Sequence, residues 1–295
     1  MVLIARMRFD MRRPIRNCAI ILSSVICLLM LVQPTRAEMH RDIEFARPGG
    51  VSLTLDASIP DGRGPFPTVI IVHGGGFARG DKQTYVPPLF APLSDAGFAW
   101  FTINYRLHPQ VRFPAPVEDV EAAIRFVRAH AREYKVDLRR VVLMGESAGG
   151  TLVSFVGVQN RSAIKLAAVV PFYGVHDWEQ RAAEEAAGKV GPSIWREFFS
   201  VPAGNSMAAL ARMREVSAAT YVRKGLPPFL LIHGTSDQQV NYQQSVTMQQ
   251  RMNQAGNLCD LITVEGGPHG MAVITKYPET GVRMIAWLKI TLRIR

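Results

Sequence analysis

Cysteine is scarce in this sequence, with three residues in 295. Cys18 and Cys27 lie in an N-terminal segment that we expect to be removed, which leaves Cys259 alone in the mature chain. A mature chain with one cysteine has no intrachain disulfide, so Cys259 is predicted to be a packed strand residue. No spacing of histidine, cysteine, aspartate or glutamate is typical of a metal site, and none is expected.

The sequence also lacks an apolar run of the roughly 20 residues that a membrane-spanning helix needs. Its nearest approach is Cys18–Val32, which follows several arginines. This pattern indicates a secretory signal peptide over residues 1–37, with cleavage after Ala37 and only transient contact with the membrane. We therefore expect a secreted or periplasmic protein. An uncleaved membrane anchor is the alternative, because Arg36 is a poor neighbour for a cleavage site. The true start remains open between Met1, Met7 and Met11.

Clustered positive charge is missing as well, although the net charge is +10. Up to Ala37 there are six arginines and one aspartate, so the leader accounts for half of that charge. The remaining 28 basic and 23 acidic residues are scattered, without basic runs or interleaved aromatic residues. This distribution argues against nucleic-acid binding.

Residues 38–295 are enough for one large domain and too few for two independent ones. Hydrophobic residues make up 48% of the chain and charged residues 20%, which excludes general disorder. Two short antiparallel strands are predicted first, followed by alternating strands and helices from residue 68 onward. That alternation indicates an α/β fold, a mostly parallel twisted sheet with helices on both faces.

The predicted strands are short and mostly β-branched or apolar, and they cover Ile43–Arg47, Val51–Ser58, Thr68–Val72, Ala99–Tyr105, Val141–Met144, Leu166–Phe172, Pro228–Ile232 and Leu258–Val264. Helices are predicted after Ser147 and over Pro88–Ala96, Val117–Tyr134, Asn241–Ala255 and Pro278–Ile294. The segment 178–223 has no strand signal and is predicted to be a short helical lid inserted between two strands.

An apolar strand ends in Gly145-Glu146-Ser147-Ala148-Gly149, the pattern G-x-S-x-G. A serine in this setting sits on a sharp strand-to-helix turn, with its hydroxyl exposed at the carboxyl edge of the sheet. The tight turn leaves no room for side chains two residues to either side, and Gly145 and Gly149 meet that demand. Ser147 is therefore a candidate nucleophile.

A serine nucleophile needs an imidazole to take its proton and a carboxylate to orient that imidazole. Asp237 follows the strand Pro228–Ile232, and His269 follows the strand that ends at Val264. The order Ser147, Asp237, His269 is the one expected when a G-x-S-x-G turn carries the nucleophile.

The reaction also needs backbone N–H donors for the oxyanion that forms on the substrate. Gly74, Gly75 and Gly76 follow the strand Thr68–Val72 and can turn their amides inward, since no Cβ stands in the way. We expect Gly75, Gly76 and Ala148 to form this oxyanion hole, and Gly74 to be needed for the bend.

These motifs resemble the α/β-hydrolase esterase/lipase family related to hormone-sensitive lipase and to bacterial acetylxylan and feruloyl esterases. The matches are H-G-G-G-F at His73, N-Y-R-L at Asn104, F-P-A-P-V-E-D at Phe113, G-E-S-A-G-G at Gly145, H-G-T-S-D at His233 and G-P-H-G at Gly267. Two departures are Pro268, where relatives commonly carry Gly or Ala, and an N-terminal segment too short for a full helical cap. The resemblance implies the fold and the triad more specifically than the substrate.

Other histidines and carboxylates offer competing assignments. The pair His176-Asp177 follows the strand Leu166–Phe172 and is an alternative dyad. His73 is expected to hold the glycine loop, and His233 to be structural. We expect Arg106 and Asp119 to form a buried ion pair, while His108 and His130 are predicted to lie on the surface.

The sequence thus predicts a serine carboxylesterase that hydrolyses short-chain acyl esters and needs no cofactor. Its expected substrate is a small-molecule ester, with an acylated polysaccharide as a further candidate. Alternatives are an amidase, an arylformamidase or a peptidase on the same fold, or a non-catalytic binding protein. Trp195, Phe198 and Phe199 are expected to pack the lid on the body, with lining of the acyl or alcohol site as the alternative. Oligomeric state is not predicted.

Overall fold

The computed structural model describes residues 37–159, 165–204 and 206–294. Residues 37–295 form one compact unit. The predicted signal peptide, with Cys18 and Cys27, lies outside the described residues except for Ala37. Among the described helices, none is long and apolar enough to cross a membrane.

An eight-stranded sheet forms the centre of this unit, in the order β1-β2-β4-β3-β5-β6-β7-β8. The first strand pair and the pair β2–β4 are antiparallel, and all other neighbours are parallel. The bounds are β1 Glu38–Ala46, β2 Leu53–Ile59, β3 Phe66–Val72, β4 Ala99–Ile103, β5 Val136–Glu146, β6 Ala168–Phe172, β7 Phe229–Gly234 and β8 Cys259–Val264. The predicted mostly parallel α/β sheet is confirmed.

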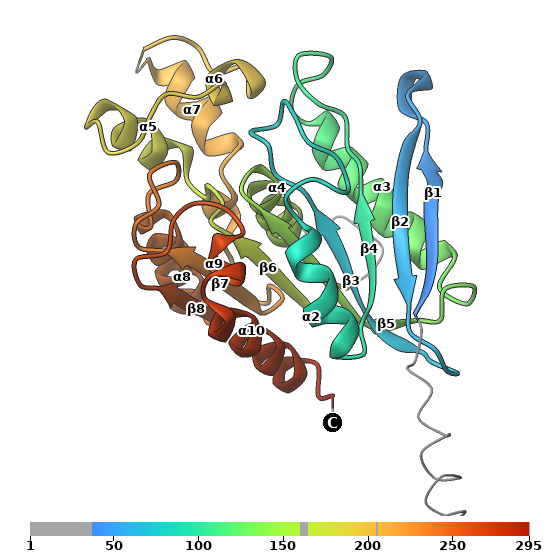
Figure 1. The fold of residues 1–295 in the computed structure, drawn as a ribbon. Helices are drawn as coiled ribbons and strands as arrows, with labels where there is room; N and C mark the ends of the chain where they lie inside the picture. Colours follow the sequence, from blue (N-terminus) through green and yellow to red (C-terminus); the bar gives the residue numbers. More distant parts are fainter. Residues whose placement is uncertain (1–36, 160–164, 205, 295) are drawn as a thin grey trace, which may run out of the picture. The chain divides into compact units, whose positions relative to one another are not determined.

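Helices cover both faces of this sheet (Figure 1). The α-helices are α2 Phe90–Asp95, α3 Ala115–Ala129, α4 Ala148–Gln159, α5 Trp178–Ala186, α6 Trp195–Phe198, α7 Met207–Glu215, α8 Gln243–Gln254, α9 Ala272–Thr275 and α10 Pro278–Thr291. Three 3₁₀ turns complete the described elements, η1 Pro48–Gly50, η2 Pro87–Leu89 and η3 Ala218–Tyr221.

The two faces of the sheet carry separate apolar cores. On one face α3, α4 and α8 pack through residues such as Ile124, Val153 and Met248. On the other face α2 and α10 pack through residues such as Leu93 and Met284. Because both faces are covered, β3 can be a continuous β-branched run, and its residues Thr68–Val72 are all buried.

Some element ends differ from the sequence prediction. β4 stops at Ile103, two residues before the predicted end at Tyr105, and Asn104 Oδ1 accepts the N–H of Lys82 at 2.8 Å. α3 ends at Ala129 because the following turns reverse the chain into β5, with Lys135 at φ 51°.

Between β6 and β7 the described residues form α5, α6, α7 and η3 in succession, and none of them belongs to a strand. In Figure 1 α5, α6 and α7 lie beyond the ends of the central strands, and Gly191, Pro192 and Ser193 of this segment line the cavity described below. We call residues 178–223 the lid segment.

Candidate active site

Ser147 lies alone between the end of β5 and the start of α4, with its backbone at φ 52°. This left-handed conformation strains a residue with a side chain by roughly 1–3 kcal/mol and is held by surrounding structure. A Cβ at Gly145 would lie 2.5 Å from the carbonyl oxygen of Gly149, and one at Gly149 would lie 2.2 Å from that of Val72. The G-x-S-x-G glycines are therefore needed because backbone atoms occupy that space.

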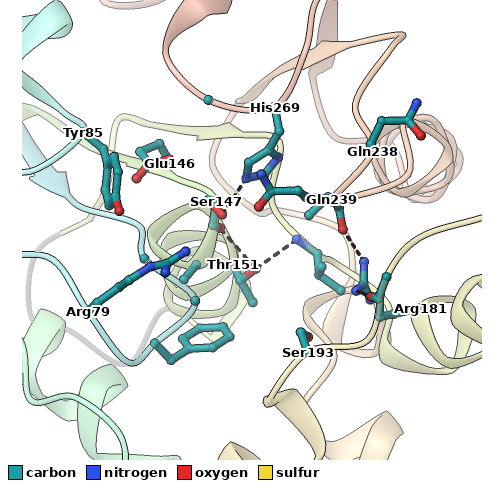
Figure 2. Close-up of a pocket in the computed structure, with 18 of the residues that line it drawn as sticks. Arg79, Tyr85, Glu146, Ser147, Thr151, Arg181, Ser193, Gln238, Gln239 and His269 are labelled. Carbon is teal, nitrogen blue, oxygen red and sulfur yellow. Dashed lines mark hydrogen bonds between the residues drawn. The ribbon is translucent and has the colours of Figure 1, made fainter.

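The hydroxyl of Ser147 is one end of a hydrogen-bonded chain. His269 Nε2 lies 2.9 Å from Ser147 Oγ, and His269 Nδ1 lies 2.6 Å from Asp237 Oδ2. Figure 2 shows His269 above Ser147 at the wall of the pocket. These three residues come from three different strand ends, and the parallel sheet brings those ends to one edge. Such a chain can transfer the serine proton to the imidazole while the carboxylate fixes the ring.

Asp237 is buried and accepts four polar contacts. Its Oδ1 accepts the N–H groups of Gln239 at 2.8 Å and Val240 at 2.9 Å. Burial alone would raise the pKa of Asp237, but hydrogen bonds from His233 and His269 and the electrostatic interaction with His269 outweigh burial and hold it well below its usual range. Asp237 is thus ionised at neutral pH and can stabilise an imidazolium on His269.

His233 is the second histidine at this carboxylate, a contact that the sequence did not reveal. Its Nε2 lies 3.3 Å from Asp237 Oδ2 and 3.0 Å from the carbonyl oxygen of Val240. Its Nδ1 lies 2.7 Å from Ser245 Oγ. His233 therefore holds Asp237 and its loop in place, and the H-G-x-x-D spacing was the signal available.

The glycine loop after β3 supplies the free backbone donors. The N–H of Gly74 is bonded to Glu146 Oε1, so Gly74 serves the bend. In the described part of the chain, the N–H groups of Gly75, Gly76 and Ala148 have no protein acceptor, and these residues line the pocket at Ser147. Gly75 has φ 104°, which a residue with a side chain rarely adopts. These three amides are available to an oxyanion on an atom bonded to Ser147.

His73 and Tyr105 fix the base of this loop. The His73 ring is buried, with Nδ1 2.7 Å from the carbonyl oxygen of Gly74, and stacks on Tyr105 at 4.3 Å. The Tyr105 hydroxyl donates to the His73 carbonyl oxygen at 3.1 Å. Burial lowers the pKa of His73 to about 4, so the ring is neutral while it holds the loop.

A cavity of about 520 Å³ opens at Ser147. Its lining combines the glycine loop after β3, the lid segment and the loop after β7, with Phe77, Val175 and Trp178 as apolar walls and Arg79, Tyr85, Arg181 and Gln238 as polar ones. Trp195, Phe198 and Phe199 do not line it but are buried behind it. Trp195 stacks on Trp178 at 5.0 Å and Phe198 on Phe77 at 4.3 Å, so this cluster packs the lid segment on the body.

The pair His176-Asp177 does not form a dyad. Asp177 caps α5 by accepting the N–H of Glu179 at 3.0 Å, and it pairs with Arg251 at 2.8 Å. His176 is 1% exposed, and both its ring nitrogens lack a hydrogen-bond partner. Burial comes first among the causes that lower the pKa of His176 to about 3, so this ring stays neutral.

The remaining candidates have structural places. Arg106 donates from Nε to Asp119 Oδ2 at 2.9 Å, the predicted buried ion pair. His108 is 7% exposed, so its predicted surface position is wrong, because it packs near Glu197 of the lid segment. His130, the other predicted surface histidine, is only partly exposed, since its ring stacks on Phe126.

Cys259 is buried, and burial raises the pKa of its thiol to about 12. Within residues 37–159, 165–204 and 206–294, no group of three potential metal ligands comes together.

Comparison with known proteins adds three findings. A family model described as BD-FAE matches residues 55–252. The chain is 29% identical over 192 residues to a probable carboxylic ester hydrolase, LipM, of Mycobacterium tuberculosis, covering 62% of this chain and 44% of that protein. It is 27% identical over 235 residues to an acetylxylan esterase of Xylanibacter ruminicola, covering 78% and 46%.

Solved structures share the fold. A truncated carbohydrate esterase from gut microbiota superposes with a TM-score of 0.72 and 24% identity, covering 89% of this chain and 99% of that one. Esterase 2 of Thermogutta terrifontis with butyrate bound has a TM-score of 0.69 and 23% identity, covering 88% and 95%. The chain spans about half the length of the curated relatives named above.

Proposed function

Because the chain belongs to the BD-FAE family of α/β hydrolases, we propose that it is a serine carboxylesterase acting on short-chain acyl esters. The observation that carries the proposal is the hydrogen-bonded chain from Ser147 through His269 to Asp237, which ends in a cavity beside three free backbone amides. The names of the matched relatives agree, since they are ester hydrolases.

In the proposed reaction Ser147 Oγ attacks the ester carbonyl carbon while His269 Nε2 takes the hydroxyl proton. The carbonyl oxygen becomes an oxyanion and accepts hydrogen bonds from the N–H groups of Gly75, Gly76 and Ala148. Loss of one such donor typically costs about 2.7–4 kcal/mol of transition-state stabilisation. The tetrahedral intermediate collapses, the C–O bond to the alcohol breaks, and His269 returns the proton to the departing alkoxide.

Water completes the cycle on the acyl-enzyme. His269 takes a proton from water, the hydroxide attacks the acyl carbon, and the second tetrahedral intermediate expels Ser147 with the proton returned to Oγ. Asp237 remains ionised throughout and stabilises the imidazolium in both steps.

The size of the cavity agrees with a small-molecule ester. At about 520 Å³ it lies in the range of small-molecule pockets, and it is closed on the lid side by the buried cluster behind Trp178. The matched Thermogutta esterase is described with propionate and with butyrate bound, which agrees with short chains. An acylated carbohydrate is a candidate physiological substrate, in line with the names of two matched proteins.

The test is a panel of p-nitrophenyl acetate, butyrate and palmitate, acetylated xylan, a feruloyl ester and an anilide. Wild type should hydrolyse acetate and butyrate faster than palmitate, and Ser147→Ala should fall to near background while its melting temperature is kept. Faster cleavage of the anilide than of any ester would contradict the proposed esterase function and indicate an amidase. Equal rates of ester hydrolysis for wild type and Ser147→Ala would show that Ser147 is not the nucleophile.

A further inference from the structure

Arg79 is a cation in the pocket that the esterase reaction does not use. It lies on the loop that follows Gly75 and Gly76, and its side chain is exposed and lines the cavity at Ser147. Figure 2 shows Arg79 and Arg181 on opposite sides of Ser147. In the described part of the chain Arg79 has no hydrogen bond and no carboxylate within ion-pair distance.

The loop that presents Arg79 is held firmly. A Cβ at Gly75 would lie 2.0 Å from the carbonyl oxygen of Arg79, so the two backbone segments are in direct contact. Beyond Arg79 the ammonium of Lys82 binds Asp56 at 2.9 Å, and Thr102 Oγ1 donates to the Lys82 carbonyl oxygen at 2.7 Å. Because both ends of the loop are anchored, little backbone ordering is required when Arg79 binds a ligand.

The other charged groups of the cavity do not neutralise Arg79. Arg181 is buried and paired with Glu185 at 2.9 Å, so its charge is compensated. Glu146 is the one carboxylate in the lining, and it is 3% exposed and accepts the N–H of Gly74. The exposed charge facing the substrate space is therefore positive.

Tyr85 adds a donor on the same side. Its ring lines the cavity, is 45% exposed and sits on a backbone at φ 67°. Residues held in this strained conformation persist where the surrounding structure requires them, and they cluster at ligand sites. Figure 2 draws Tyr85 beside Arg79 at the rim of the pocket. A guanidinium with a phenol is a donor set suited to a carboxylate.

We propose that Arg79, with Tyr85, makes this pocket selective for esters that carry a carboxylate on the acyl or the alcohol part. This inference rests on the proposed esterase function and specifies its substrate class. The carboxylate binds the fork of Arg79 while the ester carbonyl reaches Ser147, which places the anion within the pocket rather than in bulk solvent.

The test compares each anionic ester with a neutral amide of the same shape. For the acyl part the pair is phenyl hydrogen succinate and phenyl succinamate, and for the alcohol part it is 4-acetoxybenzoate and 4-acetoxybenzamide. The background rate is measured with Ser147→Ala for every substrate. The measured quantity is the ratio of kcat/KM for the anionic ester to that for its neutral partner.

In wild type this ratio should exceed one for at least one of the two substrate pairs. The pair with the raised ratio then shows whether the preferred carboxylate lies on the acyl part or on the alcohol part of the ester. Arg79→Gln should lower the ratio by about tenfold, as expected for loss of one charge-assisted hydrogen bond. Arg79→Lys should lower it less, because the charge stays and the bidentate fork is lost. Arg283→Gln, the same change of charge at an exposed position on α10, should keep the wild-type ratio.

Salt provides an independent readout. Raising the ionic strength from about 0.01 M to about 0.5 M should reduce the wild-type ratio and leave that of Arg79→Gln unchanged, since screening weakens an exposed ion pair.

Ratios at or below one in both wild-type pairs, or an unchanged ratio in Arg79→Gln, would overturn this inference while the esterase function stands. Failure of the esterase function has a different signature, with no neutral ester hydrolysed above the Ser147→Ala background.

Discussion

At the scale of residues, the site depends on how one carboxylate is surrounded. Asp237 accepts hydrogen bonds from two backbone amides and is held between two histidines, His269 toward the pocket and His233 in the core. Of these two histidines, only His269 contacts Ser147, so the two rings have different roles. His269 can exchange a proton, and His233 fixes the acceptor that orients it.

Asp237→Asn should therefore lower kcat for p-nitrophenyl butyrate by up to roughly 10⁴, because the amide no longer fixes the required tautomer of His269. Asp177→Asn is the matched control at the same edge of the sheet. It keeps an N-cap side chain for α5 and is not among the residues that line the pocket at Ser147, so kcat should change little. A large loss of kcat in Asp177→Asn together with a small loss in Asp237→Asn would show that the wrong carboxylate has been assigned to orient His269.

Stability at acid pH should depend on His176. Burial lowers its pKa to about 3 in the folded protein, whereas an unfolded histidine titrates near 6.5. The unfolded state thus binds more protons below about pH 6.5. Above that pH the protonation of His176 does not lower the free energy of unfolding. Between about pH 6.5 and pH 3 it lowers this free energy progressively, with a slope of up to about 1.4 kcal/mol per pH unit.

His176→Leu should therefore flatten the fall in unfolding free energy between pH 6.5 and pH 4.5, as measured by urea denaturation at several pH values. The change in slope is the readout, because it is independent of any constant offset from repacking. Parallel curves for wild type and variant would mean that His176 is already protonated in the folded state or hydrogen-bonded by water.

At the scale of elements, the lid segment is joined to the body by stacked aromatic rings. Trp178 begins α5 and lines the cavity, and Trp195 begins α6 and packs behind it. Both indoles are nearly fully buried, so truncating either removes a large apolar contact. Only Trp178 lies between the substrate space and the core.

Trp178→Ala should shift the preference of the enzyme from butyrate toward hexanoate and octanoate esters, because the cavity extends into the vacated volume. Trp195→Ala should cost a similar amount of stability, about 3–5 kcal/mol, with a smaller shift in chain length. Chain-length profiles of p-nitrophenyl esters and melting curves of both variants measure this. A larger shift for Trp195→Ala would place that ring, not Trp178, at the acyl site.

At the scale of the whole molecule, we propose that the leader directs export and is cleaved after Ala37. Intact mass of the protein recovered from periplasm or medium should then correspond to a chain that begins at Glu38. Recovery in the membrane fraction, with Cys18 and Cys27 still present, would show an uncleaved anchor instead.

The Cys259 thiol, buried in β8, should stay unreactive toward thiol reagents in the folded exported protein.

The sequence by itself determined the sheet, the glycine turns and the order of the three strand-end residues, because these depend on local requirements. A β-branched run such as Thr68–Val72 is a buried strand in any context that covers both faces. Gly145 is required by the backbone of Gly149 in the same turn, whereas Gly149 is required by the carbonyl oxygen of Val72 on the neighbouring strand, and the G-x-S-x-G pattern marks both positions. Ser147, Asp237 and His269 follow apolar strands, and parallel strands place their ends at one edge.

Tertiary structure alone decided which side chains face the cavity and which are covered. His108 packs near the lid segment, and His233 reaches the carboxylate of Asp237, a contact that the H-G-x-x-D spacing allowed but did not by itself establish. Trp178 and Trp195 both lie in the lid segment, but the fold turns Trp178 toward the cavity and Trp195 behind it. Arg79 is one of many arginines in the chain until packing leaves it unpaired beside Ser147, because charge compensation depends on neighbours that are distant in sequence.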